Sequence, residues 1–263
     1  MIKLIGVPYD ANSSFLRGPA QAPARIRLME TEGSANLYAE TGEEIKGDEA
    51  YEDLGDLSFA NSDPQLAYAL IHQKIQEELS RKDKIICFGG DHSVSFPIID
   101  AYTEQISDLH VLHLDAHGDI YENFDDNPFS HASPFARLME KGQVASLTQV
   151  GLRTLTQHQK EQIDKYNINV VEARDFNYSF MKNLKGPLYI SLDLDVLDPA
   201  FAPGVSHHEP GGLSTRQVLN ILQNLEQTVV GADIVEYNPA RDVNNMTAMV
   251  AYKFFKELVA KML

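Results

Sequence analysis

Cysteine and tryptophan are nearly absent from this chain. Cys87 is the one cysteine, and there is no tryptophan. A single cysteine excludes a disulfide within the chain, and sparse cysteine is typical of proteins in a reducing compartment. The first residues, "MIKLIG", lead directly into a predicted strand and lack the basic start and longer apolar run of a signal peptide. We therefore expect a cytoplasmic location.

Long apolar runs are missing too, and so is a basic character. No stretch approaches the roughly 18 consecutive apolar residues that indicate a membrane-spanning helix, so we expect no membrane contact. Lys and Arg number 22 against 38 Asp and Glu, which gives a net charge of −16. Proteins that bind nucleic acid usually present a basic surface, so this balance argues against such a partner. The acidity could attract a cationic ligand, or it could simply maintain solubility.

The chain has enough apolar residues for a sizeable core, with 43% hydrophobic and 23% charged among 263 residues. Residues 30–62 form the least regular segment. We interpret this segment as an excursion rather than a linker, because the 29 residues before it are too few to fold alone. The sequence therefore predicts a single domain over residues 1–263.

Short runs rich in Val, Ile and Leu recur along the chain and predict strands. They lie at 2–7, 84–88, 109–114, 147–151, 169–171, 188–192 and 229–235. Several read as buried on both faces, which is typical of parallel sheets. Helices are predicted from Asp63-Pro64 to about 81, from the cap Ser214 to 225, and over 246–263. On the first helix, the expected apolar face consists of Leu66, Leu70, Ile71, Ile75 and Leu79. Alternation of strands and helices indicates an α/β fold.

Acidic and histidine residues gather where three predicted strands end. The segment "HVLHLDAHGD" places Asp115, His117 and Asp119 at alternate positions, which share one face if the extended shape continues past Leu114. "CFGGDHSVS" places Asp91 and His92 after a second strand, and "YISLDLDVLDPAFAPG" places Asp193 and Asp195 after a third. Ligands of open parallel sheets bind outside the carboxyl ends of the strands, so we expect the three clusters to meet.

Four carboxylates brought together would repel one another or take up protons, and two divalent cations would neutralise them. Mixed carboxylate and imidazole ligands favour Mn²⁺ or a similar first-row metal, and two such ions can activate a shared water near neutral pH. Taken alone, an Asp-x-His pair often caps a loop, and an Asp-x-Asp pair can hold Mg²⁺ for phosphate chemistry. The three clusters together predict a binuclear metal site. Asp91 is expected to orient an imidazole rather than to bind metal.

The motifs "GGDHS", "DAHGD" and "SLDLDVLDPAFAPG" resemble the three signature motifs of the ureohydrolases, the family of arginases and agmatinases. The resemblance spans nearly the whole chain. "FSHASPFARLME" and "GVSHHEPGGLSTRQVLNILQNLEQTVVGADIVEYNPARD" are most similar to the arginases of plants. This family implies a three-layer α/β/α fold around a mainly parallel eight-stranded sheet, a fold shared with deacetylases. It also implies two Mn²⁺ ions and a homo-oligomer, either a trimer or a hexamer.

The resemblance also implies roles for individual residues. His92 and Asp119 would belong to the first metal site, and His117 and Asp195 to the second. Asp115 and Asp193 would bridge both ions, which also makes Asp115 part of the catalytic set. His131, in "FSHAS", matches the proton-shuttling histidine of the family. Glu236, in "DIVEYNP", matches the carboxylate that faces the substrate's guanidinium, a group that prefers bidentate carboxylate partners.

Some positions depart from the family. Gly118 stands where other members often carry Thr or Pro. Tyr121 replaces the Asn with which animal arginases hold the α-amino-acid end of arginine, and Thr154-Leu155-Thr156 replaces their Asp-Val-Asp. The animal mode of tail recognition therefore cannot be transferred. His207 and His208 either line the mouth of the site or pack a loop.

The sequence thus predicts a manganese amidinohydrolase that cleaves a cationic guanidino compound to urea and an amine. Arginase, which converts arginine to ornithine and urea, is the first choice; agmatinase or a hydrolase of another guanidino compound is the alternative. A two-metal phosphoesterase would need basic residues around the metals, and few lie near these motifs. A catalytically dead relative would have lost a ligand or the shuttle, and a deacetylase would hold one zinc.

Overall fold

A computed structural model describes residues 1–32, 35–60 and 63–263. In these residues eight strands form one sheet, with the spatial order β2-β1-β3-β8-β7-β4-β5-β6, and every neighbouring pair is parallel. The strands are β1 Ile2–Gly6, β2 Glu52–Asp56, β3 Lys84–Phe88, β4 His110–Leu114, β5 Ser146–Leu152, β6 Asn169–Glu172, β7 Leu188–Asp193 and β8 Val229–Val235. None of the helices in the described ranges is both long and apolar enough to cross a membrane.

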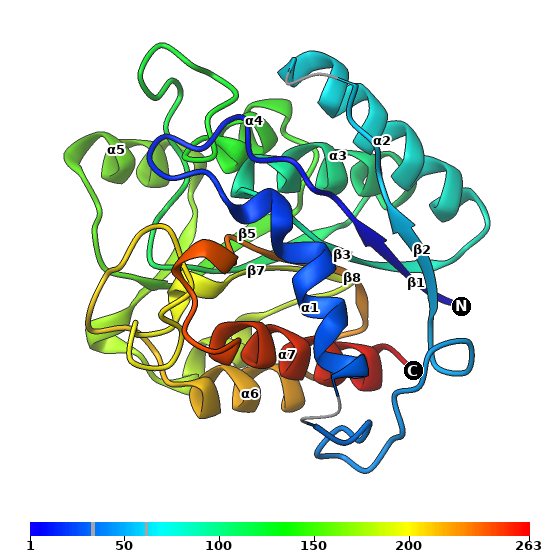
Figure 1. The fold of residues 1–263 in the computed structure, drawn as a ribbon. Coiled ribbons are helices and arrows are strands. Elements are labelled where there is room, and N and C mark those ends of the chain that lie inside the picture. The colour runs from blue at the N-terminus through cyan, green and yellow to red at the C-terminus, as the bar shows by residue number, and fades with distance from the viewer. Residues whose placement is uncertain (33–34, 61–62) are drawn as a thin grey trace.

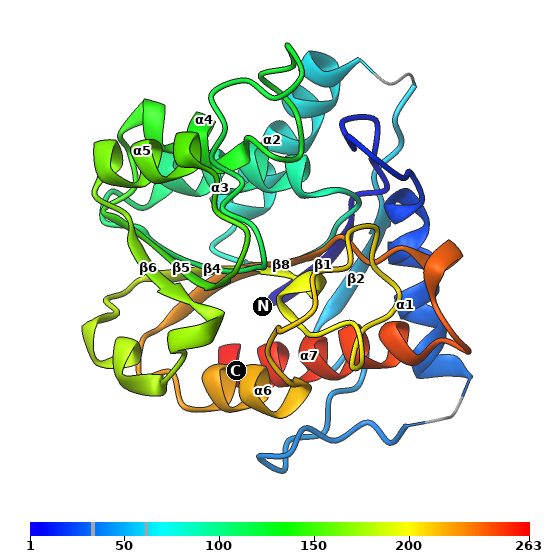
Figure 2. The same cartoon turned by 90° about the vertical axis from the view of Figure 1, so that its left-hand side faces the viewer.

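Helices cover both faces of the sheet and make three layers. The helices are α1 Ala22–Thr31, α2 Pro64–Ser80, α3 Ser95–Gln105, α4 Pro134–Lys141, α5 Gln157–Tyr166, α6 Thr215–Gln223 and α7 Met246–Met262. With the sheet seen edge-on, α2, α3, α4 and α5 lie on one side and α1, α6 and α7 on the other (Figures 1 and 2). The predicted three-layer α/β/α fold with an eight-stranded parallel sheet is confirmed.

Each face of the sheet has its own apolar core. Ile26, Leu222 and Phe254 belong to the core beneath α1, α6 and α7. Ile71 and Ile98 belong to the core beneath α2 and α3. Since β3, β4 and β7 are covered on both sides, nearly all of their side chains are buried. This double burial explains why these strands read as continuous apolar runs in the sequence.

The expected apolar face of α2 is partly wrong. Leu66 and Leu70 are 61% and 36% exposed, whereas Ala67, Ile71 and Ile75 are buried. The buried residues follow one another four apart and form a single stripe along the helix. Leu66 and Leu70 lie one position before members of that stripe, which turns them about 100° away from the core.

Strand β2 lies within residues 30–62, the segment interpreted as an irregular excursion. Its sequence, "EDLGD", carries too few apolar residues to suggest a strand, because β2 is an edge strand that is mostly exposed. Arg27 on α1 holds this edge in place by binding the carboxylates of both Asp53 and Asp56. Residues 33–34 and 61–62 of the segment lie outside the described residues.

The order of the strands brings the predicted clusters together. Strands β3, β8, β7 and β4 are consecutive neighbours in the sheet and run in the same direction. The segments that leave their carboxyl ends therefore start side by side. At this edge the backbone around Gly90 is tightly enclosed, because Gly90 O accepts a hydrogen bond from Glu236 N at 3.0 Å and Asp91 N donates to Tyr9 O at 2.9 Å.

We expect Gly90→Ala to destabilise the fold. A Cβ atom at this position would lie 1.8 Å from Tyr9 O, so backbone must move. Overpacking of this kind costs about 1–3 kcal/mol. Gly47→Ala is the matched control, because the nearest atom to its Cβ would be 3.8 Å away. Urea-induced unfolding of both variants measures the difference. Equal stability of the two variants would contradict the enclosure of Gly90.

Candidate active site

His92 is surrounded by three carboxylates at the carboxyl edge of the sheet. It starts the 3₁₀ helix His92–Val94 that follows β3. Its Nδ1 atom lies 3.1 Å from an oxygen of each of Asp115, Asp119 and Asp193. Asp115 directly follows β4, and Asp193 is the last residue of β7. Segments from three strands therefore converge on one nitrogen atom.

This first cluster fits a bound cation. The Nδ1 atom of His92 is buried, and it has no hydrogen bond of acceptable geometry although three oxygens surround it. Three carboxylates that meet at one point repel strongly in a buried site, even though His113 Nε2 lies 2.7 Å from Asp115 Oδ2. A divalent cation among the four atoms would satisfy all of them, and one imidazole with several carboxylates is a donor set suited to Mn²⁺ and similar metals.

A second cluster lies beside the first and shares Asp115 with it. The Nδ1 atom of His117 lies 3.0 Å from Asp195 Oδ2 and 3.4 Å from Asp115 Oδ1. Asp115 thus turns one oxygen toward His117 and the other toward His92. Asp193 turns Oδ2 toward His92, while its Oδ1 accepts a hydrogen bond from Asp195 N at 2.7 Å. The two clusters are therefore adjacent and joined through a carboxylate.

The backbone conformation that brings these side chains together differs from the expected one. The extended shape does not continue past Leu114, since β4 ends there and Asp119 adopts a positive φ of 44°. A turn rather than one strand face gathers Asp115, His117 and Asp119. Contacts with the loop after β7 fix the turn, because Ala116 N donates to Asp195 Oδ1 at 3.1 Å. The expectation of convergence is correct, but its proposed cause is wrong.

Polar residues inside the strands orient these side chains. His92 Nε2 lies 3.0 Å from Ser191 Oγ, which donates in turn to Asp233 Oδ1 at 2.7 Å. His113 Nε2 lies 2.7 Å from Asp115 Oδ2. Burial by itself would raise the pKa of Asp115, but the neighbouring imidazoles of His113, His117 and His92 hold that pKa well below its usual range. Sequence reasoning missed Ser191, Asp233 and His113, although each is a polar residue within an otherwise apolar strand.

Asp91 has a different place from the one expected. Among the described residues, its carboxylate forms no hydrogen bond or ion pair with an imidazole. Its carboxylate accepts hydrogen bonds from Asn12 N, Ser13 Oγ and Ser93 N, at 3.1–3.2 Å. Burial, followed by the charge of Glu236, raises the pKa of Asp91 to about 6. The residue caps the 3₁₀ helix after β3 and ties the loop around residues 12–13 to the site.

His131 and Glu236 form a buried pair next to the clusters. His131 Nδ1 lies 2.7 Å from Glu236 Oε1, and His131 Nε2 lies 2.8 Å from Ser14 Oγ. Glu236 Oε1 also accepts a hydrogen bond from His92 N at 2.9 Å. Burial lowers the pKa of His131, but the charge and hydrogen bond of Glu236, together with the charges of Asp91 and Asp119, outweigh burial and raise that pKa to about 9. His131 therefore carries a proton at neutral pH in this arrangement, and the pKa of Glu236 is held low.

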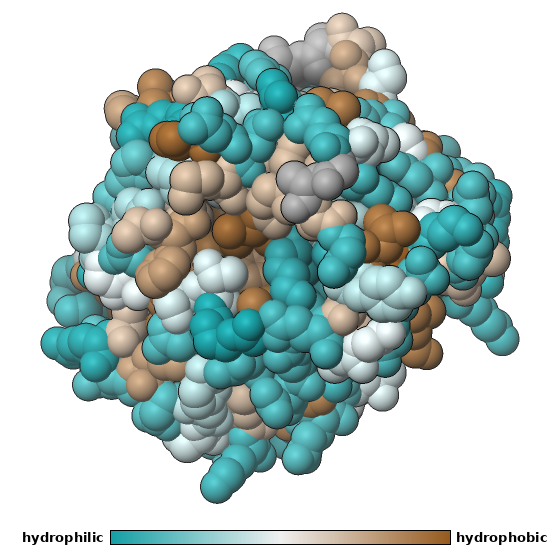
Figure 3. All heavy atoms as spheres, turned by 60° about the horizontal axis from the view of Figure 1, so that its bottom comes forward, coloured by the Kyte–Doolittle hydropathy of each residue, from teal (hydrophilic) through white to brown (hydrophobic). Residues whose placement is uncertain are grey.

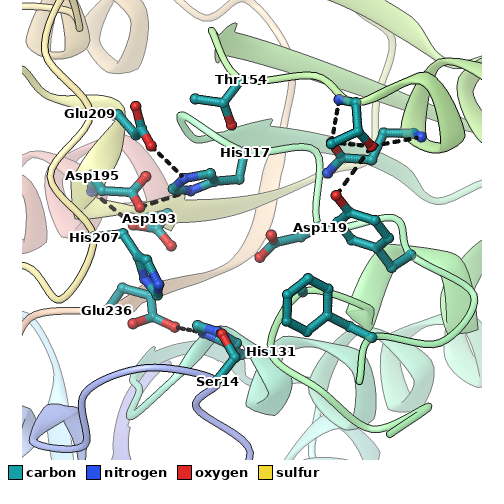
Figure 4. A pocket seen from close by; sticks show the side chains of 15 residues that line it. Ser14, His117, Asp119, His131, Thr154, Asp193, Asp195, His207, Glu209 and Glu236 are labelled. Atoms are coloured by element: carbon teal, nitrogen blue, oxygen red, sulfur yellow. Dashed lines mark hydrogen bonds and ion pairs between the residues drawn. The ribbon is translucent and has the colours of Figure 1, made fainter. Parts of the chain in front are cut away.

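These groups line a cavity of about 360 Å³ (Figure 4). Part of the cavity wall is polar and is formed by Tyr121, Thr154, Thr156, Gln159 and Glu209. Tyr121 OH lies 3.1 Å from Thr156 Oγ1, which joins two loops across this wall. In the face of the molecule shown by Figure 3, hydrophobic residues form separate patches among hydrophilic ones.

The two adjacent histidines of "GVSHHEPGG" have different environments. His207 lines the cavity, with its ring centre 5.5 Å from that of His131. Burial lowers the pKa of His207, which favours a neutral imidazole. His208 instead lies 2.7 Å from Pro203 O and 2.9 Å from the Arg241 guanidinium. The first therefore lines the mouth of the site and the second packs its loop.

Arg153 fixes the loop that carries Asp195 and Glu209. Within the described residues, each hydrogen bond of its guanidinium goes to a backbone carbonyl. Two bonds reach Glu209 O, at 2.6 and 2.8 Å, and one reaches Asp195 O at 2.6 Å. Further bonds reach Gly151 O and Leu197 O, each at 3.2 Å. A planar group with five donors can hold several stretches of backbone at once, which a lysine cannot do.

A sequence profile of the arginase family matches residues 1–260. The chain belongs to the arginase family. It is 46% identical over 274 residues to "Arginase 1, mitochondrial" of Arabidopsis thaliana, an alignment that covers 98% of this chain and 80% of the relative. It is 34% identical to an N(1)-aminopropylagmatine ureohydrolase of Thermus thermophilus, with coverage of 90% and 83%. The solved arginase of Medicago truncatula superposes with a TM-score of 0.94 at 41% identity, covering 99% of this chain and 87% of that one.

Membership confirms the predicted ureohydrolase family and its similarity to plant arginases. The protein is a hydrolase of guanidino compounds. The expected cytoplasmic location is wrong, because similar plant relatives from Arabidopsis and Medicago are named mitochondrial arginases. The stretch "MIKLIG" is a poor guide to location, because its residues Ile2–Gly6 form a buried strand of the sheet and their composition reflects that role.

Proposed function

We propose that this protein is a manganese-dependent arginase that hydrolyses arginine to ornithine and urea. The observation that carries the proposal is the pair of adjacent carboxylate–imidazole clusters facing the His131–Glu236 pair in one cavity. Arginine is favoured because plant arginases share 42–46% of this sequence, against 30% for an agmatinase of Bacillus cereus.

The proposed ligand set follows the two clusters. The first ion would be held by His92, Asp115, Asp119 and Asp193. The second would be held by His117, Asp115, Asp193 and Asp195. Two divalent cations at these positions would act as Lewis acids and would lower the pKa of a water molecule toward neutrality. Four carboxylates and two imidazoles match the preference of Mn²⁺ for oxygen ligands with some nitrogen.

Glu236 and His131 supply the remaining chemistry in this proposal. The Glu236 carboxylate pairs with the guanidinium and orients its carbon for attack by water. Attack forms a carbon–oxygen bond, and the bond from that carbon to the alkyl nitrogen then breaks. Of the two protons that the water loses, one replaces the proton given up by His131 and the other completes the ammonium group of the leaving amine. His131, with its pKa raised to about 9, holds the proton that the leaving amine needs. Urea and ornithine result, and Ser14 keeps the His131 ring in position.

Agmatine is a second candidate substrate. Arginine carries an α-carboxylate, yet no lysine or arginine is among the described residues that line the cavity. Neutral donors such as Thr154, Thr156 and Gln159 would have to bind that carboxylate. Agmatine lacks it and would need no such partner. We nevertheless propose arginine as the substrate, because the similarity to plant arginases outweighs the lack of a cationic partner for the α-carboxylate.

Urea release tests the proposed function directly. Purified protein stripped of metal and reloaded with Mn²⁺ should release urea from arginine with a higher kcat/KM than from agmatine. Protein without added metal should release little. A higher efficiency with agmatine would favour the second candidate, and no urea from either compound would refute the proposal.

We expect Asp115→Asn and Asp193→Asn to lower bound Mn²⁺ from two ions per chain to one or none, because each aspartate is proposed to touch both ions. Asp175→Asn, at an exposed position, is the charge-matched control. Elemental analysis after gel filtration gives the metal content. Two ions retained in both active-site variants would show that neither aspartate bridges the site.

His131→Ala should lower turnover by about 10²–10⁴-fold while both ions remain, since a positioned proton donor contributes about that much. Added imidazole should restore part of the rate, because it can enter the vacated space and carry the proton. Steady-state urea release with metal analysis makes the test. Unchanged turnover would remove His131 from the reaction.

We also propose that residues 1–263 form a single domain that assembles into a trimer or hexamer. Support for one domain comes from the single sheet and from the match of residues 1–260 to one family profile. The oligomeric state rests on the family resemblance and stays a prediction, which light scattering can measure.

A further inference from the structure

Two carboxylates in the cavity are left over when the proposed metal ligands are set aside. They are Glu236 and Glu209. Figure 4 shows them at opposite ends of the labelled cluster, with His117, Asp195 and His207 between them. Glu236 is buried and tied to His131, whereas Glu209 is more exposed and lies toward the mouth. One cavity therefore presents two separate negative groups to a ligand.

Glu209 is held at the rim by its backbone rather than by its carboxylate. Arg153 donates twice to Glu209 O, which fixes the position of the residue. The carboxylate has a distant neighbour in His117, since Oε1 lies 3.9 Å from Nε2 of that imidazole. This separation is longer than a hydrogen bond. The side chain is 38% exposed, so its oxygens remain accessible to a ligand in the cavity.

The carboxylate of Glu209 has no lysine or arginine partner among the described residues that line the cavity. Two divalent ions would compensate the four aspartates, and Glu236 already has a partner in His131, whose Nδ1 lies 2.7 Å from Glu236 Oε1. Glu209 would still be negative. Thr154, Thr156 and Tyr121, which line the cavity together with Glu209, are neutral. A cationic group on the ligand would give this carboxylate a close partner, since His117 Nε2 lies 3.9 Å away.

We propose that Glu209 binds the ammonium group on the substrate tail and thereby makes the enzyme selective for guanidino compounds with a second cationic centre. This inference rests on the proposed function. It concerns the tail that arginine and agmatine have in common, an ammonium group at the end of a short aliphatic chain. A carboxylate–ammonium bond in a partly enclosed site is charge-assisted and directional. Glu209 is thus a specificity-determining residue.

A different role for Glu209 predicts different behaviour. A carboxylate near the free nitrogen of a metal-binding histidine can orient the imidazole and strengthen metal binding. In that case Glu209 would affect every substrate alike, because it would act through His117 and the ion. Tail recognition instead affects only substrates that carry the ammonium group. The distinction can be made with a pair of compounds that differ in this group alone.

Agmatine and 1-butylguanidine are such a pair, since they have the same four-carbon chain and only agmatine carries the amine. We expect Glu209→Gln to lower kcat/KM for agmatine and arginine by about 10–100-fold, the range that follows from about 1.5–3 kcal/mol for a hydrogen bond to a charged group. Efficiency with 1-butylguanidine should change less than about twofold, and bound Mn²⁺ should stay constant. Glu77→Gln, an exposed position on α2, is the charge-matched control.

Equal losses for agmatine and 1-butylguanidine together with reduced metal content would overturn the proposal in favour of an orienting role. Unchanged efficiency with all three compounds would overturn it as well. Calorimetric titration of the metal-free protein with agmatine and 1-butylguanidine gives a readout that needs no turnover. The wild type should bind agmatine more tightly, and Glu209→Gln should reduce that preference, whereas Glu77→Gln should leave it unchanged. If this preference is found in protein that releases no urea under any condition, the proposed function fails while the assignment of Glu209 stands.

Discussion

The mutual repulsion of four carboxylates at one edge of the sheet is the constraint on which the rest of this structure depends. Asp115, Asp119, Asp193 and Asp195 lie within contact distance of His92 or His117. Such a group is costly to bury unless cations and hydrogen bonds compensate for it. The fold supplies the hydrogen bonds itself and leaves the remaining charge for cations.

Much of the polar structure around the site serves this compensation. Backbone N–H groups of Ala116 and Asp195 each donate to an aspartate. A relay of Ser191 and Asp233 fixes the far side of the His92 ring. Ser191 and Asp233 lie on β7 and β8, two buried strands in the middle of the sheet. The donor atoms are therefore oriented before any ligand arrives, and preorganisation of this kind lowers the cost of binding and of reaction.

The cavity at this edge of the sheet has a buried end and an open end with different roles. The buried end holds the aspartates and the His131–Glu236 pair, where exclusion of water strengthens electrostatic interactions. The open end is formed by loops, among them the loop pinned by Arg153 and the one that carries Tyr121. Loops of this kind can change without disturbing the sheet. Related enzymes with different substrates, such as the aminopropylagmatine ureohydrolase, are consistent with variation at this end on a shared framework.

The sequence by itself determined the fold class, most of the strands and the clusters at their ends. The strands at 84–88 and 188–192 can be predicted from their apolar runs, because strands buried on both faces need continuous apolar residues. Ligands such as Asp115 and His117 can be predicted from the sequence, because charged residues directly after such runs are costly unless a cation or another partner compensates for them. The exposed edge strand β2 escaped this reasoning, since it buries too little surface to leave an apolar pattern.

Only the tertiary structure decided how the side chains meet. The division of Asp115's two oxygens between His92 and His117 depends on a turn after β4 that no periodicity predicts. Partners far away in the chain determine the remaining features of the site. These are the different environments of His207 and His208, the carbonyl contacts of Arg153 and the partly exposed position of Glu209. Local sequence patterns indicate whether a residue is buried, because buried positions favour certain residue types. They do not indicate which distant atom a side chain contacts, because that contact follows from the packing of the whole chain.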